Sequence, residues 1–161
     1  SIKRSGIQTS IDAHKTLGFK ASGFKRIGFD VADSGQDLCA NVAAHGSVVE
    51  WADEWKAQED ELLKSCMRTY SVARERGSSV LYDSIGVGAG SGAKFKELNA
   101  DKPNPVRYEK FNAGAAVHEP EKLYQRPDIT NGDMFANIKA QTWWLVADRF
   151  RNTFKIRRAH V

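Results

Sequence analysis

An alternation of apolar and polar residues is the pattern around which the rest of the chain can be organised. Ile27, Phe29 and Val31 alternate with Gly28 and Asp30, which is typical of a half-buried β-strand. An aspartate within such a strand is costly to bury unless a partner neutralises it. The pattern therefore predicts a strand whose carboxylate has a specific task.

A second apolar run, 80–85, repeats this arrangement around Asp83 and leads into the glycine-rich stretch 86–92. Two strand-borne aspartates far apart in sequence indicate one site, where neighbouring strands bring them together. Carboxylate oxygens are the hard ligands that Mg²⁺ and Mn²⁺ prefer, and a cation makes their mutual repulsion tolerable. We therefore predict a divalent-metal site at Asp30 and Asp83.

The remaining pattern predicts an alternation of strands and helices. We expect strands at 38–44, 48–51 and 106–111, helices at 10–18, 59–76, 93–99 and 133–154, a tight turn at 45–47 and a loop at 112–127. Ser10 is the expected N-cap of the first helix, and Gly18 and Gly77 are the expected ends of the first two. The order after the first helix, β-β-β-α-β-α-β-α, predicts a mixed sheet with a three-stranded antiparallel meander and helices on both faces.

The glycine-rich stretch after Asp83 does not match a phosphate-binding Walker motif. Lys94 is not preceded by the required glycine, and no Ser or Thr follows it. A loop that lets the backbone pass close to the metal site, or to a DNA phosphate, is favoured over a nucleotide site. Lys94 and Lys96 are candidates for contact with phosphates there.

Composition fits one soluble globular domain. The chain has 161 residues, of which 41% are hydrophobic and 27% charged, and a formal net charge of +4. The basic residues gather near the two ends, whereas 50–61 is an acidic block. The ends are equally compatible with solvated surfaces and with contact to a polyanion.

Other reactive side chains give weaker signals. Cys39 and Cys66 have no metal-binding or redox spacing, so we predict small core residues in a reducing compartment. Trp143 and Trp144 could stack on bases, but their apolar neighbours favour the core. Ser84 and the four histidines show no catalytic spacing, and no apolar run approaches membrane-spanning length.

Three blocks of sequence carry a resemblance to a known family. The stretches 28–37 (GFDVADSGQD), 82–90 (YDSIGVGAG) and 137–144 (NIKAQTWW) resemble the nuclease domain of the large terminase subunit of tailed bacteriophages. Each block is loose alone, but their order and separation are specific. The resemblance implies a ribonuclease-H-like fold, in which carboxylates on the first strand, the fourth strand and a later helix converge on two metal ions.

The resemblance also implies an activity. It implies an endonuclease, a phosphodiester hydrolase that cuts concatemeric double-stranded viral DNA during genome packaging, with two Mg²⁺ or Mn²⁺ ions as cofactors. The implied partners are DNA, an ATPase motor domain upstream in the same polypeptide, the portal protein and the small terminase subunit, without a membrane. The implied location is the host cytoplasm, at the procapsid.

Site residues carry over by position. Asp30 matches the first-strand ligand and Asp83 the second; Asp133, which opens the predicted helix 133–154, is the provisional third. Asp128 competes with it, and the third acid could instead lie beyond residue 161. The candidates for binding the DNA backbone are Lys94, Lys96, Arg149 and Arg151.

The expected organisation is a connector and a nuclease domain. Residues 1–24 are predicted to connect to a missing upstream domain, and 25–161 to form the nuclease domain, with a C-terminal truncation as an open alternative. Other functions stay open at this point. They are another ribonuclease-H-like nuclease, such as a Holliday-junction resolvase or transposase core, and a non-catalytic DNA-binding or docking module of the packaging motor.

Overall fold

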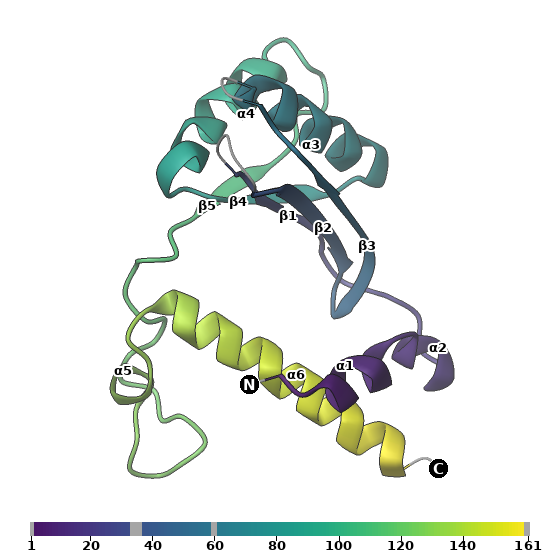
Figure 1. The fold of residues 1–161 in the computed structure, drawn as a ribbon, viewed down its shortest axis with the longest axis vertical. Helices are drawn as coiled ribbons and strands as arrows, with labels where there is room; N and C mark the ends of the chain where they lie inside the picture. The colour runs from purple at the N-terminus through teal and green to yellow at the C-terminus, as the bar shows by residue number, and fades with distance from the viewer. Residues whose placement is uncertain (1, 33–36, 59–60, 160–161) are drawn as a thin grey trace. The chain divides into compact units, whose positions relative to one another are not determined.

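The structure is a computed structural model that describes residues 2–32, 37–58 and 61–159. The chain forms two compact units (Figure 1). Ala21–Asn112 make a sheet unit, and Ser1–Lys20 together with Ala113–Val161 make a helical unit. The division into a connector 1–24 and a nuclease domain 25–161 remains a prediction.

The sheet unit contains five strands in the order β3-β2-β1-β4-β5 among the described residues. Their bounds are β1 Lys25–Asp30, β2 Cys39–His45, β3 Val48–Trp55, β4 Ser79–Asp83 and β5 Tyr108–Phe111. β1, β2 and β3 pair antiparallel, whereas β4 pairs parallel with both β1 and β5. The predicted meander and mixed sheet are therefore confirmed.

The turn between β2 and β3 depends on a glycine. Gly46 has a φ of +58°, and a Cβ there would lie 2.0 Å from the carbonyl oxygen of Ser22. Only glycine fits both the left-handed backbone and this close approach. The predicted tight turn at 45–47 is confirmed.

Two helices, α3 (Leu62–Arg76) and α4 (Ser91–Asn99), pack on the same face of this sheet (Figure 1). The core between helices and sheet is apolar and centred on Phe95, which is fully buried. Its other buried members are Ile27, Phe29, Ala43, Cys66, Tyr70, Ala73, Val80, Tyr82 and Val106. Both helices lie on one face, so helices on the opposite face stay a prediction for the described part of this unit.

The ends of α3 follow the sequence signals. Gly77 adopts a left-handed conformation and its N–H bonds back to Arg74, as a C-terminal cap does. Residues 59 and 60, the predicted start, lie outside the described residues. Cys39 and Cys66 are both fully buried, so their prediction as core residues is confirmed.

Two arginines of α3 pair with two acids of the acidic block, Asp53 and Glu50, on β3. The Arg68 guanidinium bonds the Asp53 carboxylate and lies 4.6 Å from the centre of a Trp55 ring. Arg76 repeats the pattern with Glu50 and Trp51, at 4.9 Å from the ring. Each arginine thus covers a tryptophan that seals the core at the edge strand.

The helical unit holds α1 (Arg4–Ser10), α2 (Ala13–Thr16), α5 (Asn131–Met134) and α6 (Ile138–Ala159). α1 packs on α6, and a Cβ added at Gly6 would lie 3.5 Å from the Cβ of Phe150. The Arg157 guanidinium donates to the carbonyl oxygen of Thr9 at 2.6 Å, near the end of α1. Arg157 therefore satisfies a backbone acceptor that a helix end leaves open.

Two helix predictions need correction. Ser10 does not cap a helix 10–18, because it is the last residue of α1, and in the rest of that range only Ala13–Thr16 is helical. The predicted helix 133–154 is two helices, because Phe135 is extended and the Asn137 side chain accepts the N–H of Ala140, as an N-cap does. None of the helices among the described residues combines the length and the hydropathy of a membrane-spanning segment.

Candidate active site

The register of the sheet brings Asp30 and Asp83 to neighbouring positions. Phe29 pairs with Tyr82 in the parallel ladder, so Asp30 and Asp83 follow at the next step of each strand. Because side chains alternate, both aspartates lie on the face opposite the buried Phe29 and Tyr82. The structure thus unites the two residues that the sequence singled out.

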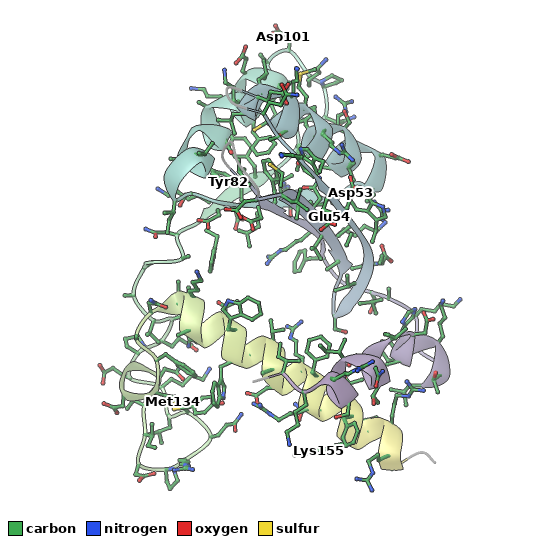
Figure 2. The ribbon with its side chains drawn as sticks, viewed as in Figure 1. Asp53, Glu54, Tyr82, Asp101, Met134 and Lys155 are labelled. Carbon is green, nitrogen blue, oxygen red and sulfur yellow. The ribbon has the colours of Figure 1, made fainter. Side chains whose placement is uncertain are left out.

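A third carboxylate, Glu54, lies on the same face. Asp30 pairs with Ala40 in β2, and Ala40 pairs with Glu54 in β3. The intervening strand puts β1 and β3 about 10 Å apart. Figure 2 labels Glu54 beside Asp53. As the neighbouring residue of the strand, Asp53 lies on the opposite face, where its carboxylate accepts a hydrogen bond from Arg68.

Glu54 is not among the site residues that the sequence predicts. The strand predicted at 48–51 ended before Glu54, because Ala52, Asp53 and Glu54 lack apolar alternation. The aromatic residue Trp55, four residues after Trp51, was the signal for a longer strand. The pairing register could not have been read from the sequence.

The carboxylate of Asp83 is held by the start of the following loop. The N–H of Ile85 donates to its Oδ1 at 3.0 Å, which is a turn that fixes the side chain on its own backbone. Oriented carboxylates lose less freedom when they bind a ligand. Asp30 lies at the end of β1 and is exposed to solvent.

The glycines after Asp83 serve close packing. A Cβ at Gly88 would lie 2.0 Å from the carbonyl oxygen of Asp83, and one at Gly92 would lie 2.4 Å from the hydroxyl of Tyr82. The stretch forms a short 3₁₀ helix, η1 (Gly86–Gly90), that leads directly into α4. The backbone at Gly88 therefore passes close to the backbone of Asp83, whereas its approach to a metal ion or a DNA phosphate stays a prediction.

Asp133, the provisional third ligand, caps a helix in the helical unit. Its Oδ2 accepts the N–H of Thr130 at 3.1 Å and the Thr130 hydroxyl at 2.6 Å. These hydrogen bonds lower the pKa of Asp133, so the carboxylate is ionised at neutral pH. Its role as a metal ligand stays a prediction, as does the competing role of the exposed Asp128.

Two carboxylates alone are an incomplete metal site. Among residues 2–32, 37–58 and 61–159, no group of three or more His, Cys, Asp or Glu side chains is arranged to hold a metal ion. The oxygens of Asp30 and Asp83 suit a hard divalent cation, but further ligands must complete its shell. Of the two nearby aspartates in the block 28–37, Asp33 lies outside the described residues and Asp37 is exposed.

The four predicted DNA-backbone residues differ in their surroundings. Lys94 lies 3.6 Å from Glu97 on α4, and Arg151 pairs with Asp148 and lies over the ring of Trp144. Lys96 and Arg149 are exposed. Their contact with DNA stays a prediction.

The prediction that Trp143 and Trp144 belong to the core is wrong. Trp143 is 61% exposed and Trp144 37% exposed, although they precede the buried Ala147 by four and three residues and so lie on the same side of α6. α6 is hydrophobic on more than one side, so its apolar pattern could not tell which side is buried.

Comparison with solved structures tests the resemblance. The nuclease domain of the large terminase subunit gp2 of bacterial virus Sf6 matches with a TM-score of 0.85 and 32% identity, over 96% of this chain. The predicted resemblance to terminase nuclease domains is confirmed. Two structures of a single-residue variant of that terminase domain also match, one with manganese and beta-thujaplicinol (TM-score 0.85) and one with calcium (0.84), both at 32% identity over 96% of this chain.

This chain spans 65% of the length of each of these terminase chains. No model of a protein family and no curated protein matches it. The shared fold is the mixed α/β arrangement predicted as ribonuclease-H-like, with a five-stranded sheet flanked by helices.

Proposed function

We propose that this chain is a metal-dependent endonuclease domain that cuts double-stranded viral DNA during genome packaging. The observation that supports this most is the position of Asp30 and Asp83 on one face at the ends of adjacent parallel strands. The resemblance to a terminase nuclease domain with bound manganese or calcium supports the same activity.

In this proposal Asp30 and Asp83 hold the metal, with Asp133 as the provisional third ligand and two ions as the expected number. A bound Mg²⁺ or Mn²⁺ ion would polarise the phosphodiester and lower the pKa of a water molecule. The residues of this chain orient the carboxylates: the Ile85 N–H fixes Asp83, and the rigid ladder of β1 fixes Asp30.

The proposed setting follows from the family. The substrate is concatemeric double-stranded DNA, which basic residues hold by its phosphates without reading the sequence. The proposed partners are an ATPase domain of the same polypeptide, the portal protein and the small terminase subunit, in the host cytoplasm at the procapsid.

The test is the substitution Asp30→Asn, which removes the charge and keeps the size. Supercoiled plasmid is incubated with Mn²⁺ or with chelator, and nicked and linear products are followed on a gel. We expect the parent to cut only with Mn²⁺ and the variant to cut at least about a hundredfold more slowly, because a metal-binding oxygen becomes a neutral amide.

Asp101→Asn is the matched control. Asp101 is exposed, lies far along the chain on a loop of the sheet unit (Figure 2) and has a φ of +58°, which asparagine tolerates. This variant should cut like the parent. Equal cutting by Asp30→Asn and Asp101→Asn would refute the assignment of Asp30.

A further inference from the structure

The ends of α1 and α6 form a cleft in the helical unit that the proposed site does not use. A cavity of about 640 Å³ is lined by Ser5, Gln8, Thr9, Arg157 and Arg158. A second cavity of about 380 Å³ shares Ser5, so the two are neighbours. We call the two together the α1–α6 cleft.

The lining of the α1–α6 cleft carries positive charge and no carboxylate. The larger cavity has two guanidinium groups, and the smaller adds Lys3, Arg151 and Lys155 (Figure 2 labels Lys155). From residue 149 to residue 159, α6 has no acidic side chain. The last acid before that stretch, Asp148, accepts hydrogen bonds from Tyr124 and Gln125 and pairs with Arg151.

The polar groups of the larger cavity suit a phosphate. Arginine presents a planar set of N–H donors that matches phosphate oxygens, and Ser5 and Gln8 add neutral donors beside it. The Thr9 hydroxyl donates instead to the carbonyl oxygen of Ser5 at 2.7 Å. The bond from Arg157 to the Thr9 carbonyl uses one donor and fixes the guanidinium at the cleft wall. A prepositioned arginine loses less side-chain entropy when it binds an anion.

We propose that the α1–α6 cleft binds the phosphate backbone of duplex DNA through Arg157 and Arg158. This proposal rests on the proposed function for the choice of DNA as the polyanion. It adds Arg157 and Arg158 to the four basic residues that the sequence indicated, of which Arg151 lines the smaller cavity of the same cleft.

The experiment measures the affinity for a short fluorescein-labelled duplex by anisotropy, with chelator present so that no cutting occurs. Arg157→Gln/Arg158→Gln should raise Kd about tenfold at moderate salt, because two phosphate contacts are lost. The slope of log Kd against log salt should fall by nearly two, since each contact contributes about 0.9.

A second variant guards against a folding defect. Arg157→Gln removes the bond to Thr9, whereas Gln8→Glu leaves this bond intact and places a carboxylate in the cleft. Gln8→Glu should also raise Kd several-fold at unchanged melting temperature. The control Arg74→Gln/Arg126→Gln loses the same charge at exposed positions outside the cleft and should shift Kd less than about twofold.

The outcomes separate this proposal from the proposed function. Cleft variants that bind DNA like the control, while the parent cuts with Mn²⁺, would overturn the cleft alone. A parent that never cuts, with cleft variants that lose binding, would overturn the nuclease and leave the cleft. Inorganic phosphate should displace the duplex no better than chloride at equal ionic strength; stronger displacement would overturn the choice of DNA in favour of a small-anion site.

Discussion

The sheet unit and the helical unit place their charged residues in different ways. In the sheet unit, hydrogen-bonded strands around a buried core bring Asp30 and Asp83 to one face. In the helical unit, basic side chains of α6 and of Lys3, which precedes α1, line a cleft. Few large side chains of this unit are buried. A ladder fixes the positions of two acids, whereas a helix pair concentrates charge over a surface.

This difference suits two kinds of task. Metal binding needs oxygens at fixed separations, which a sheet provides because strand spacing and register vary little. Holding a phosphate backbone needs positive charge over a length of duplex and tolerates looser geometry. The two units should therefore differ in rigidity and packing, and substitutions in each can measure that difference.

The largest loss of folding stability is expected when a core side chain of the sheet unit is truncated. Phe95 is fully buried against Phe29, Tyr82 and Tyr108, so Phe95→Ala should destabilise the chain by about 3–5 kcal/mol. Phe150 of α6 is half-buried against α1, so Phe150→Ala should lower the free energy of unfolding by only about 1–2 kcal/mol. Urea unfolding followed by circular dichroism measures both, and equal losses would contradict the contrast in packing.

A smaller effect is expected at the loop behind Asp83. Gly88→Ala forces a Cβ against the Asp83 carbonyl and should cost about 1–3 kcal/mol. Gly28→Ala is the control, because the nearest atom to a Cβ there is the Val42 carbonyl oxygen at 3.9 Å. Gly28→Ala should leave the stability of the chain unchanged or raise it by up to about 1 kcal/mol. Thermal unfolding measures both variants. A Gly88→Ala variant as stable as the parent would show that the loop does not depend on the close approach of Gly88 to the Asp83 carbonyl.

The smallest effect concerns the dependence of stability on pH. Burial raises the pKa of the Cys66 thiol from 9.0 to about 11. Between these values the unfolded chain has lost a proton that the folded chain keeps, so stability falls as pH rises above 9.0.

The control for this effect is Cys66→Ala, which has no thiol. The stability advantage of the parent over Cys66→Ala should shrink by about 1 kcal/mol per pH unit in that window. Urea titrations at several pH values measure it. A stability difference between parent and Cys66→Ala that does not change with pH would contradict the burial of the Cys66 thiol in the core of the sheet unit.

Much of the sheet unit could be predicted from sequence. Alternation at 27–31 and 80–85, the turn at Gly46 and the cap at Gly77 each depend on local chemistry. The structure confirms these elements and the adjacency of Asp30 and Asp83. Local signals sufficed where a strand or helix has one clear apolar face, which the second half of β3 lacks.

The helical unit was harder to predict, for two physical reasons. The break between α5 and α6 depends on Asn137 as a cap, a polar signal inside an otherwise helical apolar pattern. The α1–α6 cleft unites residues 5–9 with residues 157 and 158, a contact that no local pattern contains. Glu54 could not be predicted for the same reason. Its position on the same face as Asp30 depends on the pairing register of β1, β2 and β3, which no local pattern contains.

The central claim is that Asp30 and Asp83 form one metal site. Titration with Mn²⁺, followed by the paramagnetic resonance signal of the free ion, measures its affinity in the parent, Asp30→Asn, Asp83→Asn and the double variant. We expect each single substitution to raise Kd about tenfold or more, and the double substitution to add little. Losses that simply add, or single variants that bind like the parent, would contradict a shared site.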